Sequence, residues 1–151
     1  MSKARDQRIR AASEVLLSPG ERVTATGPCW AALVRDRVSL LFLGRRQHDV
    51  ALTDRRMLVF ERSRKGPMPG DLVVGKRYET FTLEQVKRHR PLLQITVLAA
   101  NGSRMVFEFR RGQRALAGEL IARFAPQRDR ESAAPAEPVE DPVATAFWGS
   151  A

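Results

Sequence analysis

Cysteine, histidine and tyrosine are scarce in this chain of 151 residues, which contains one cysteine, two histidines and one tyrosine. The single cysteine, Cys29, cannot form a disulfide bond within the chain. With only His48 and His89 beside it, the chain also lacks the ligands for a zinc site built from cysteine and histidine. We therefore expect no metal ion and no cofactor, and a reducing compartment such as the cytoplasm.

Long apolar runs are missing as well. No stretch approaches the roughly 18 apolar residues that a membrane-spanning helix requires. The charged residues 1–6 lead into no signal-peptide pattern. The sequence therefore predicts a cytoplasmic protein, which would meet a bilayer only peripherally, at the inner face of the membrane.

Charged side chains are abundant and unevenly distributed. Lysine and arginine number 26 against 17 aspartate and glutamate, so the net charge is +9, while a hydrophobic fraction of 43% is enough for a core. We expect an N-terminal helical segment over residues 1–20, one folded domain over 21–125 with a net charge of +10, and a disordered acidic tail over 126–151, rich in proline and alanine. The apolar end of that tail, at Phe147 and Trp148, is either frayed or a docking motif.

The spacing of apolar residues changes from helical to alternating near residue 20. Alternation after Glu21 predicts a long or bent strand that is interrupted at Gly27-Pro28. Before it, Ser18-Pro19-Gly20 is expected to end a short helix whose apolar residues are Ile9, Ala12, Val15 and Leu16.

The middle of the chain predicts further strands and a loop. Residues 50–53 and 57–60 indicate two strands around a tight Asp54-Arg55 turn. Residues 66–70, with two glycines and two prolines, indicate a loop, and extended structure resumes over 78–86.

Residues 92–110 predict a hairpin whose register depends on the length of its loop. A two-residue turn at Asn101-Gly102 would pair Val97 with Val106 and place charged residues on the apolar face of the first strand. A three-residue loop with Gly102 in the left-handed conformation pairs Val97 with Met105 instead. We predict the longer loop, because it gathers on one face Leu93, Ile95, Val97, Ala99, Met105, Phe107 and Phe109.

The helical period returns after Gly112 and is expected to end at Pro126. The fold class is therefore α+β and mostly β, a bent antiparallel sheet of about seven strands with a short N-terminal helix and a C-terminal helix that caps the sheet. The apolar stripe of this last helix consists of Leu116, Ala117, Leu120, Ile121 and Phe124.

Two motifs that would indicate an enzyme fail on inspection. Residues 70–76 match most of a phosphate-binding loop, but Arg77 stands where the magnesium-binding hydroxyl is required, and a strand pattern follows where a helix is needed. Nothing in the chain places a histidine beside Cys29, so a nucleophilic thiol is unsupported. We expect a protein that is not an enzyme.

Arginine and lysine occur in groups, several of them at the ends of predicted strands. They form either a generally basic surface or a site for a phosphate-bearing partner, bound through hydrogen bonds from charged side chains. On the second interpretation the candidate ligand-binding residues are Arg35, Arg37, Arg45, Arg46, Arg55, Arg56, Arg62, Arg64 and Lys65.

An apolar run at residues 38–43 precedes two of these arginines. We favour a buried strand here, because short apolar runs in small domains are usually core. The alternative is an exposed loop that inserts Leu41, Phe42 and Leu43 into a membrane while the arginines bind lipid phosphates.

Three stretches stand in an order that is familiar from one family of small β domains: Leu17-Ser18-Pro19-Gly20-Glu21-Arg22-Val23, residues 50–60 with Thr53-Asp54-Arg55-Arg56 at their turn, and Phe81-Thr82-Leu83-Glu84-Gln85-Val86. With the closing hairpin and helix, the chain resembles a bacterial pleckstrin-homology-like (PH-like) domain over about residues 16–125. The resemblance implies a strongly bent sheet that forms a partly open barrel covered at one end by the C-terminal helix. It brings no catalytic residues, because PH-like domains bind phosphoinositides, peptides or proteins.

We predict a PH-like binding or adaptor module that recognises an anionic ligand, such as a lipid headgroup, or a protein partner on the cytosolic side. A basic nucleic-acid-binding protein is the first alternative and rests on charge alone. A protein scaffold regulated by its acidic tail is the second.

Overall fold

The computed structural model of the chain describes residues 3–34, 46–89 and 91–133. It is built mostly of strands, with one helix at each end. In chain order the elements are α1 (Lys3–Glu14), β1 (Val23–Val34), β2 (Arg46–Thr53), β3 (Arg56–Glu61), β4 (Leu72–Arg77), a short 3-10 turn (Tyr78–Thr80), β5 (Phe81–His89), β6 (Leu92–Ala99), β7 (Arg104–Arg110), a second 3-10 turn (Arg111–Gln113) and α2 (Arg114–Ala133).

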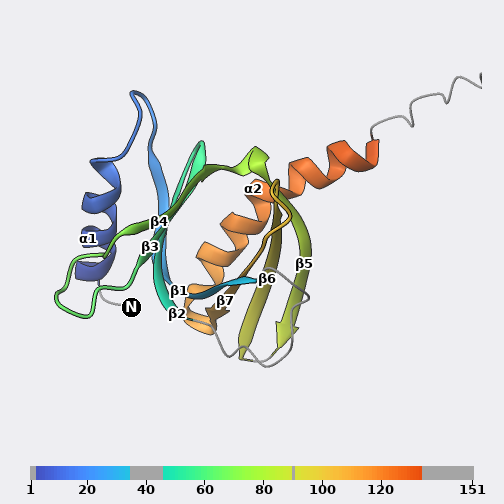
Figure 1. Cartoon of the computed structure of the whole chain (residues 1–151). Helices are drawn as coiled ribbons and strands as arrows, with labels where there is room; N and C mark the ends of the chain where they lie inside the picture. The colour runs from blue at the N-terminus through green and yellow to red at the C-terminus, as the bar shows by residue number, and fades with distance from the viewer. Residues whose placement is uncertain (1–2, 35–45, 90, 134–151) are drawn as a thin grey trace, which may run out of the picture.

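The seven strands form one antiparallel sheet in the order β4-β3-β2-β1-β7-β6-β5. The long strand β1 joins the two halves, because it pairs with β2 over most of its length and with β7 from Trp30 onward. Figure 1 shows the sheet curled around α2, with α1 outside the curl against β1 and β2. This half-barrel with a helix across its hollow is a PH-like fold, as the resemblance implied.

The two faces of the sheet have separate apolar clusters. The inner face packs against α2 through Leu116, Leu120 and Phe124, which are fully or almost fully buried. On the outer face a smaller cluster forms beneath α1, where Ile9 contacts Leu58 and Phe60. The predicted apolar stripe of the C-terminal helix is confirmed, and α1 proves to be a second cover for the sheet.

The predicted register of the β6–β7 hairpin is confirmed. Val97 pairs with Met105, and the Ala99 N–H donates to the Ser103 carbonyl at 2.8 Å, which encloses a three-residue loop. Gly102 has a φ of 83°, the left-handed conformation that the loop requires. The apolar face of this hairpin therefore lines the core as expected.

Three boundaries differ from the sequence prediction. β1 continues through Gly27 and Pro28. Proline lacks an N–H donor, but β7 pairs with β1 only from Trp30 onward, so at Pro28 the missing donor faces an edge of β1 with which none of the described strands pairs. Val15 lies beyond the end of α1 and is 85% exposed, while Leu17 packs against the outer cluster instead. α2 continues past Pro126 to Ala133, and Figure 1 shows its last turns extending beyond the sheet. The run at residues 38–43 lies outside the described residues, so both interpretations of it stay open.

Among the helices that the structure describes, none combines the length and the apolar character needed to cross a membrane.

Candidate functional site

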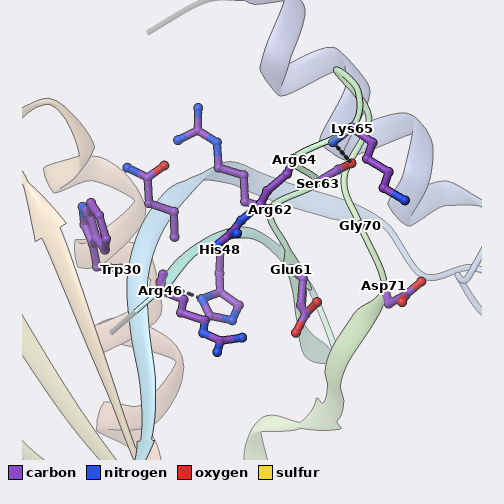
Figure 2. Close-up of a pocket in the computed structure, with 11 residues that line it drawn as sticks. Trp30, Arg46, His48, Glu61, Arg62, Ser63, Arg64, Lys65, Gly70 and Asp71 are labelled. Carbon is purple, nitrogen blue, oxygen red and sulfur yellow. Dashed lines mark hydrogen bonds between the residues drawn. The ribbon is translucent and has the colours of Figure 1, made fainter. Parts of the chain in front are cut away.

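A cleft of about 1040 Å³ opens where β2 begins and β3 ends. One wall consists of the first three residues of β2, from Arg46 to His48, together with Trp30 of the neighbouring strand β1. The other wall is the connection from β3 to β4, which contributes Arg62, Ser63, Arg64 and Lys65. Figure 2 shows these two groups of side chains around the cleft.

The cleft brings together four of the predicted ligand-binding residues. Arg46 comes from β2, whereas Arg62, Arg64 and Lys65 come from the β3–β4 connection, and all four side chains are exposed. Two carboxylates, those of Glu61 and Asp71, also line the cleft, so cationic groups outnumber them two to one. Guanidinium groups that converge from separate segments provide the charge-assisted, bidentate hydrogen bonds that phosphate oxygens accept.

His48 adds an imidazole ring to the β2 wall of the cleft. Its Nδ1 lies 2.8 Å from the carbonyl oxygen of Arg46, and because a carbonyl only accepts, Nδ1 donates its proton. In Figure 2 the imidazole lies next to the Arg46 side chain. This hydrogen bond orients the ring and leaves Nε2 without a part in it.

Backbone hydrogen bonds fix the shape of the β3–β4 connection. The Gly70 N–H donates to the Glu61 carbonyl at 2.7 Å, the Glu61 N–H donates to the Asp71 carbonyl at 2.9 Å, and the Arg62 N–H donates to Gln47 at 3.3 Å. A Cβ at Gly70 would lie only 2.8 Å from the Glu61 carbonyl oxygen, so this close approach requires glycine. The connection is therefore tied to both β3 and β2, which holds its basic side chains beside the cleft.

The other two described candidates, Arg55 and Arg56, lie at the opposite end of the β2–β3 hairpin and do not line the cleft. Arg56 is occupied in an ion pair, with Nε 2.9 Å from Glu21 Oε1 and Nη2 3.0 Å from Glu21 Oε2. Arg35, Arg37 and Arg45, together with Leu41, Phe42 and Leu43, lie outside the described residues.

The ion pair belongs to a group of three side chains that we call the Glu21 network: Glu21 and Thr53, which are buried, and Arg56, which is partly buried. Thr53 Oγ1 lies 2.7 Å from Glu21 Oε1 and also accepts the Arg56 N–H at 2.8 Å, while the Ser18 N–H donates to Glu21 Oε2 at 2.9 Å. Burial by itself raises the pKa of Glu21, but the hydrogen bonds from Arg56, Ser18 and Thr53 outweigh it and lower that pKa to about 2.

The Glu21 network joins two of the three sequence stretches that resemble PH-like domains. Glu21 lies in the first stretch, and Thr53 and Arg56 lie in the second. A further pair of hydrogen bonds links the same stretches, from the Arg22 N–H to Asp54 Oδ1 at 3.0 Å and from the Asp54 N–H to the Arg22 carbonyl at 3.1 Å. These motif residues therefore hold the segment that precedes β1, residues 18–22, against the β2–β3 turn.

The remaining chemical motifs take structural positions. Cys29 and His48 are cross-strand neighbours, but burial and the charge of Asp49 raise the pKa of the Cys29 thiol, so the thiolate is disfavoured at neutral pH. Lys76 of the incomplete phosphate-loop motif lies within β4, a strand where a nucleotide site would need a helix. In the described ranges, no three histidine, cysteine, aspartate or glutamate side chains are grouped so that they could hold a metal ion.

Sequence reasoning did not assign Trp30 to the site. The residue reaches the cleft because β1 and β2 pair Trp30 with Gln47, one residue from Arg46. No local motif carries that information, since it depends on the register between two strands whose connection is long.

No protein-family model matches the chain, and no curated protein sequence matches it. Among solved structures, it is similar to an apo structure of the activated truncation of Vav1, at 16% identity and a TM-score of 0.45 over 69% of this chain and 25% of that one. A structure of Vav1 inhibited by an allosteric inhibitor gives 17% identity and a TM-score of 0.44, over 69% of this chain and 18% of that one. The chain thus spans a quarter or less of each of these structures, and the likeness carries no argument about ligand or activity.

Proposed function

We propose that this chain is a non-enzymatic PH-like binding module, of the bacterial kind, that holds a phosphate-bearing group in the cleft between β2 and the β3–β4 connection. The observation that carries the proposal is the convergence of Arg46, Arg62, Arg64 and Lys65 from two separate segments. The imidazole of His48 and the indole of Trp30 also line the cleft and can contact the group attached to the phosphate.

Two sources of phosphate fit this chemistry, a lipid headgroup at the inner face of the membrane and a soluble phosphate ester. Each arginine or lysine close to an anionic membrane contributes about 1 kcal/mol to binding. Four cations in one cleft would therefore give useful affinity without a deep pocket. The module would act in the cytoplasm as an adaptor that brings a bound partner to the anion.

Nucleic acid is a weaker candidate, and the burial of aromatic side chains argues against it. Phe107 and Phe109 lie on the inner face of the sheet and are 0% and 1% exposed, so they are unavailable for stacking on bases. The scaffold alternative depends on the acidic tail over residues 126–151, of which 126–133 form the end of α2 and 134–151 lie outside the described residues, and it stays a prediction.

A charge-reversal experiment tests the proposal. The triple variant Arg62→Glu, Arg64→Glu and Lys65→Glu should lose at least about 100-fold in affinity, because three favourable contributions of about 1 kcal/mol each become repulsive. The probes are vesicles of phosphatidylcholine with and without phosphatidylserine, measured by co-sedimentation, and inositol hexakisphosphate in solution, measured by calorimetry. Loss on the vesicles alone would assign a lipid source, and loss with both probes would assign a general phosphate site.

A second triple variant separates the cleft from net charge. Arg8, Arg111 and Arg114 are also exposed cations and do not line the cleft, so their reversal to glutamate changes the net charge by the same amount. This control should retain most of the binding. Equal losses in the two variants would show that the cleft is not the site, and binding of a single-stranded oligonucleotide with a steep salt dependence, lost only in the cleft variant, would favour the nucleic-acid alternative.

A further inference from the structure

A second, smaller pocket of about 250 Å³ opens on the inner face of the sheet between β4 and the β6–β7 loop. Its apolar walls come from six strands. The residues that form them are Ala31, Val59, Val74, Phe81, Ala99 and Met105, all of which belong to the main core or pack against it. The pocket is therefore an opening into the hydrophobic core at the place where the half-barrel does not close.

The mouth of this pocket is polar. Lys76 of β4 stands on one side, and Asn101 and Ser103 of the β6–β7 loop stand on the other. His48 lines both this pocket and the basic cleft, so the two hollows share a wall. A ligand that extends past His48 would pass from a cationic environment into an apolar one.

The size of the pocket restricts what could enter it. Sites for drug-sized ligands usually enclose about 300 to 1,000 Å³, so a pocket of about 250 Å³ suits a single narrow chain better than a fused ring system. An apolar chain would also fill space that otherwise lacks dispersion contacts within the core.

We propose that the ligand is an amphiphile with a phosphate head and one alkyl or acyl chain, whose chain enters the apolar pocket while its head lies in the basic cleft. This inference rests on the proposed function, because the head occupies the cleft already described. It adds that the alkyl or acyl chain of the ligand leaves the bilayer or the solvent and binds inside the protein. The proposal depends on His48, which lines both hollows and therefore places them next to each other.

A series of alkyl phosphates of increasing length tests the inference, with the full-length protein of 151 residues. Ethyl, butyl, hexyl and octyl phosphate, each below its micellar concentration, are titrated into the protein by calorimetry. Affinity should rise about fourfold for each methylene that is buried, and the gain should stop once the pocket is full. Octyl glucoside, with the same chain and a neutral head, should bind much more weakly than octyl phosphate.

A matched pair of variants tests whether the alkyl chain of the ligand lies in the apolar pocket. Ala99→Leu places extra carbon atoms inside the pocket and should abolish the gain with chain length, whereas Ala100→Leu makes the same change at an exposed neighbour that does not line the pocket and should retain it. Circular dichroism and the melting temperature show whether Ala99→Leu folds. If it does not, Ser103→Leu at the mouth of the pocket provides a second blocking variant.

The outcomes separate this inference from the proposed function. Binding of ethyl phosphate with no gain along the series would overturn the alkyl pocket and leave the phosphate site intact. A gain that persists in both Ala99→Leu and Ser103→Leu would place the chain elsewhere and overturn the inference. Equal affinity for octyl phosphate and octyl glucoside would show that the head does not use the cleft, and absence of any binding would reject both proposals.

Discussion

The substitution Glu21→Gln tests the Glu21 network. The Glu21 side chain is 1% exposed and receives hydrogen bonds from Arg56, Thr53 and the Ser18 N–H. Glutamine keeps the shape of the side chain but removes the charge, which leaves the Arg56 guanidinium beside a neutral amide. We expect the folded state to lose stability at neutral pH while its architecture is retained.

The magnitude follows from the pKa of Glu21. The network lowers this pKa from its ordinary value of 4.5 to about 2, and each unit corresponds to about 1.4 kcal/mol. The ionised carboxylate therefore contributes at most about 3 kcal/mol to the free energy of unfolding at pH 7. Because the pKa is lowered in the folded state, this contribution is fully present above pH 4.5 and is lost as the pH falls toward 2.

Urea unfolding of the wild type and of Glu21→Gln at a series of pH values measures this contribution. The difference in the free energy of unfolding should reach at most about 3 kcal/mol at neutral pH. It should shrink below pH 4.5, because the unfolded wild type then takes up a proton at Glu21 that the folded protein binds only near pH 2. Taking the difference between the two proteins cancels the titration of the other carboxylates.

A second carboxylate provides the control. Glu84 also binds an arginine through two oxygens, with Arg104 Nε at 2.8 and 3.1 Å, but its side chain is 36% exposed. Exposed ion pairs contribute little, so Glu84→Gln should change the free energy of unfolding by less than about 1 kcal/mol. The reasoning fails if the two variants are equally stable, or if the effect of Glu21→Gln does not depend on pH.

Two further substitutions test the packing of α1 and the β6–β7 loop. Ile9→Ala should lower the free energy of unfolding by about 2 to 4 kcal/mol, because Ile9 is the buried apolar side chain by which α1 contacts the sheet. Amide exchange should become faster in α1 more than in β5 to β7. Val15→Ala, at an 85% exposed position, should change neither the stability nor the exchange rates. Gly102→Ala should cost about 1 to 2 kcal/mol because φ is 83° there, whereas Gly112→Ala should cost almost nothing, since a Cβ at Gly112 meets no atom within 4 Å; equal melting temperatures for the two variants would contradict this account.

The fold was predictable where local pattern and tertiary structure agree. The β6–β7 register followed from the alternation of apolar residues, because only one loop length places Val97 and Met105 on the same face. The path through Pro28 was not predictable, since a proline is tolerated in a strand only if its missing donor faces an unpaired side. The exposure of Val15 was missed for a similar reason, because helical spacing does not indicate where a helix ends against a sheet.

The candidate site was predictable in composition more than in arrangement. The sequence identified Arg46, Arg62 and Arg64 as anion-binding candidates, and the structure brings them to one cleft. It gave Arg56 the same status, although that side chain is engaged by Glu21. The distinction depends on a contact between residues 35 positions apart, which no local pattern of charge contains. The apolar pocket was out of reach as well, because it exists only where the curl of the sheet leaves β4 and the β6–β7 loop apart.

The contact between Glu21 and Arg56 has a consequence for how such sequences diverge. Loss of the carboxylate alone leaves a partly buried cation without its counter-charge, and loss of the arginine alone leaves a buried carboxylate that keeps only the hydrogen bonds from Ser18 and Thr53. Either single change should therefore destabilise the fold more than an apolar replacement of both residues. We expect the two positions to change together in related sequences.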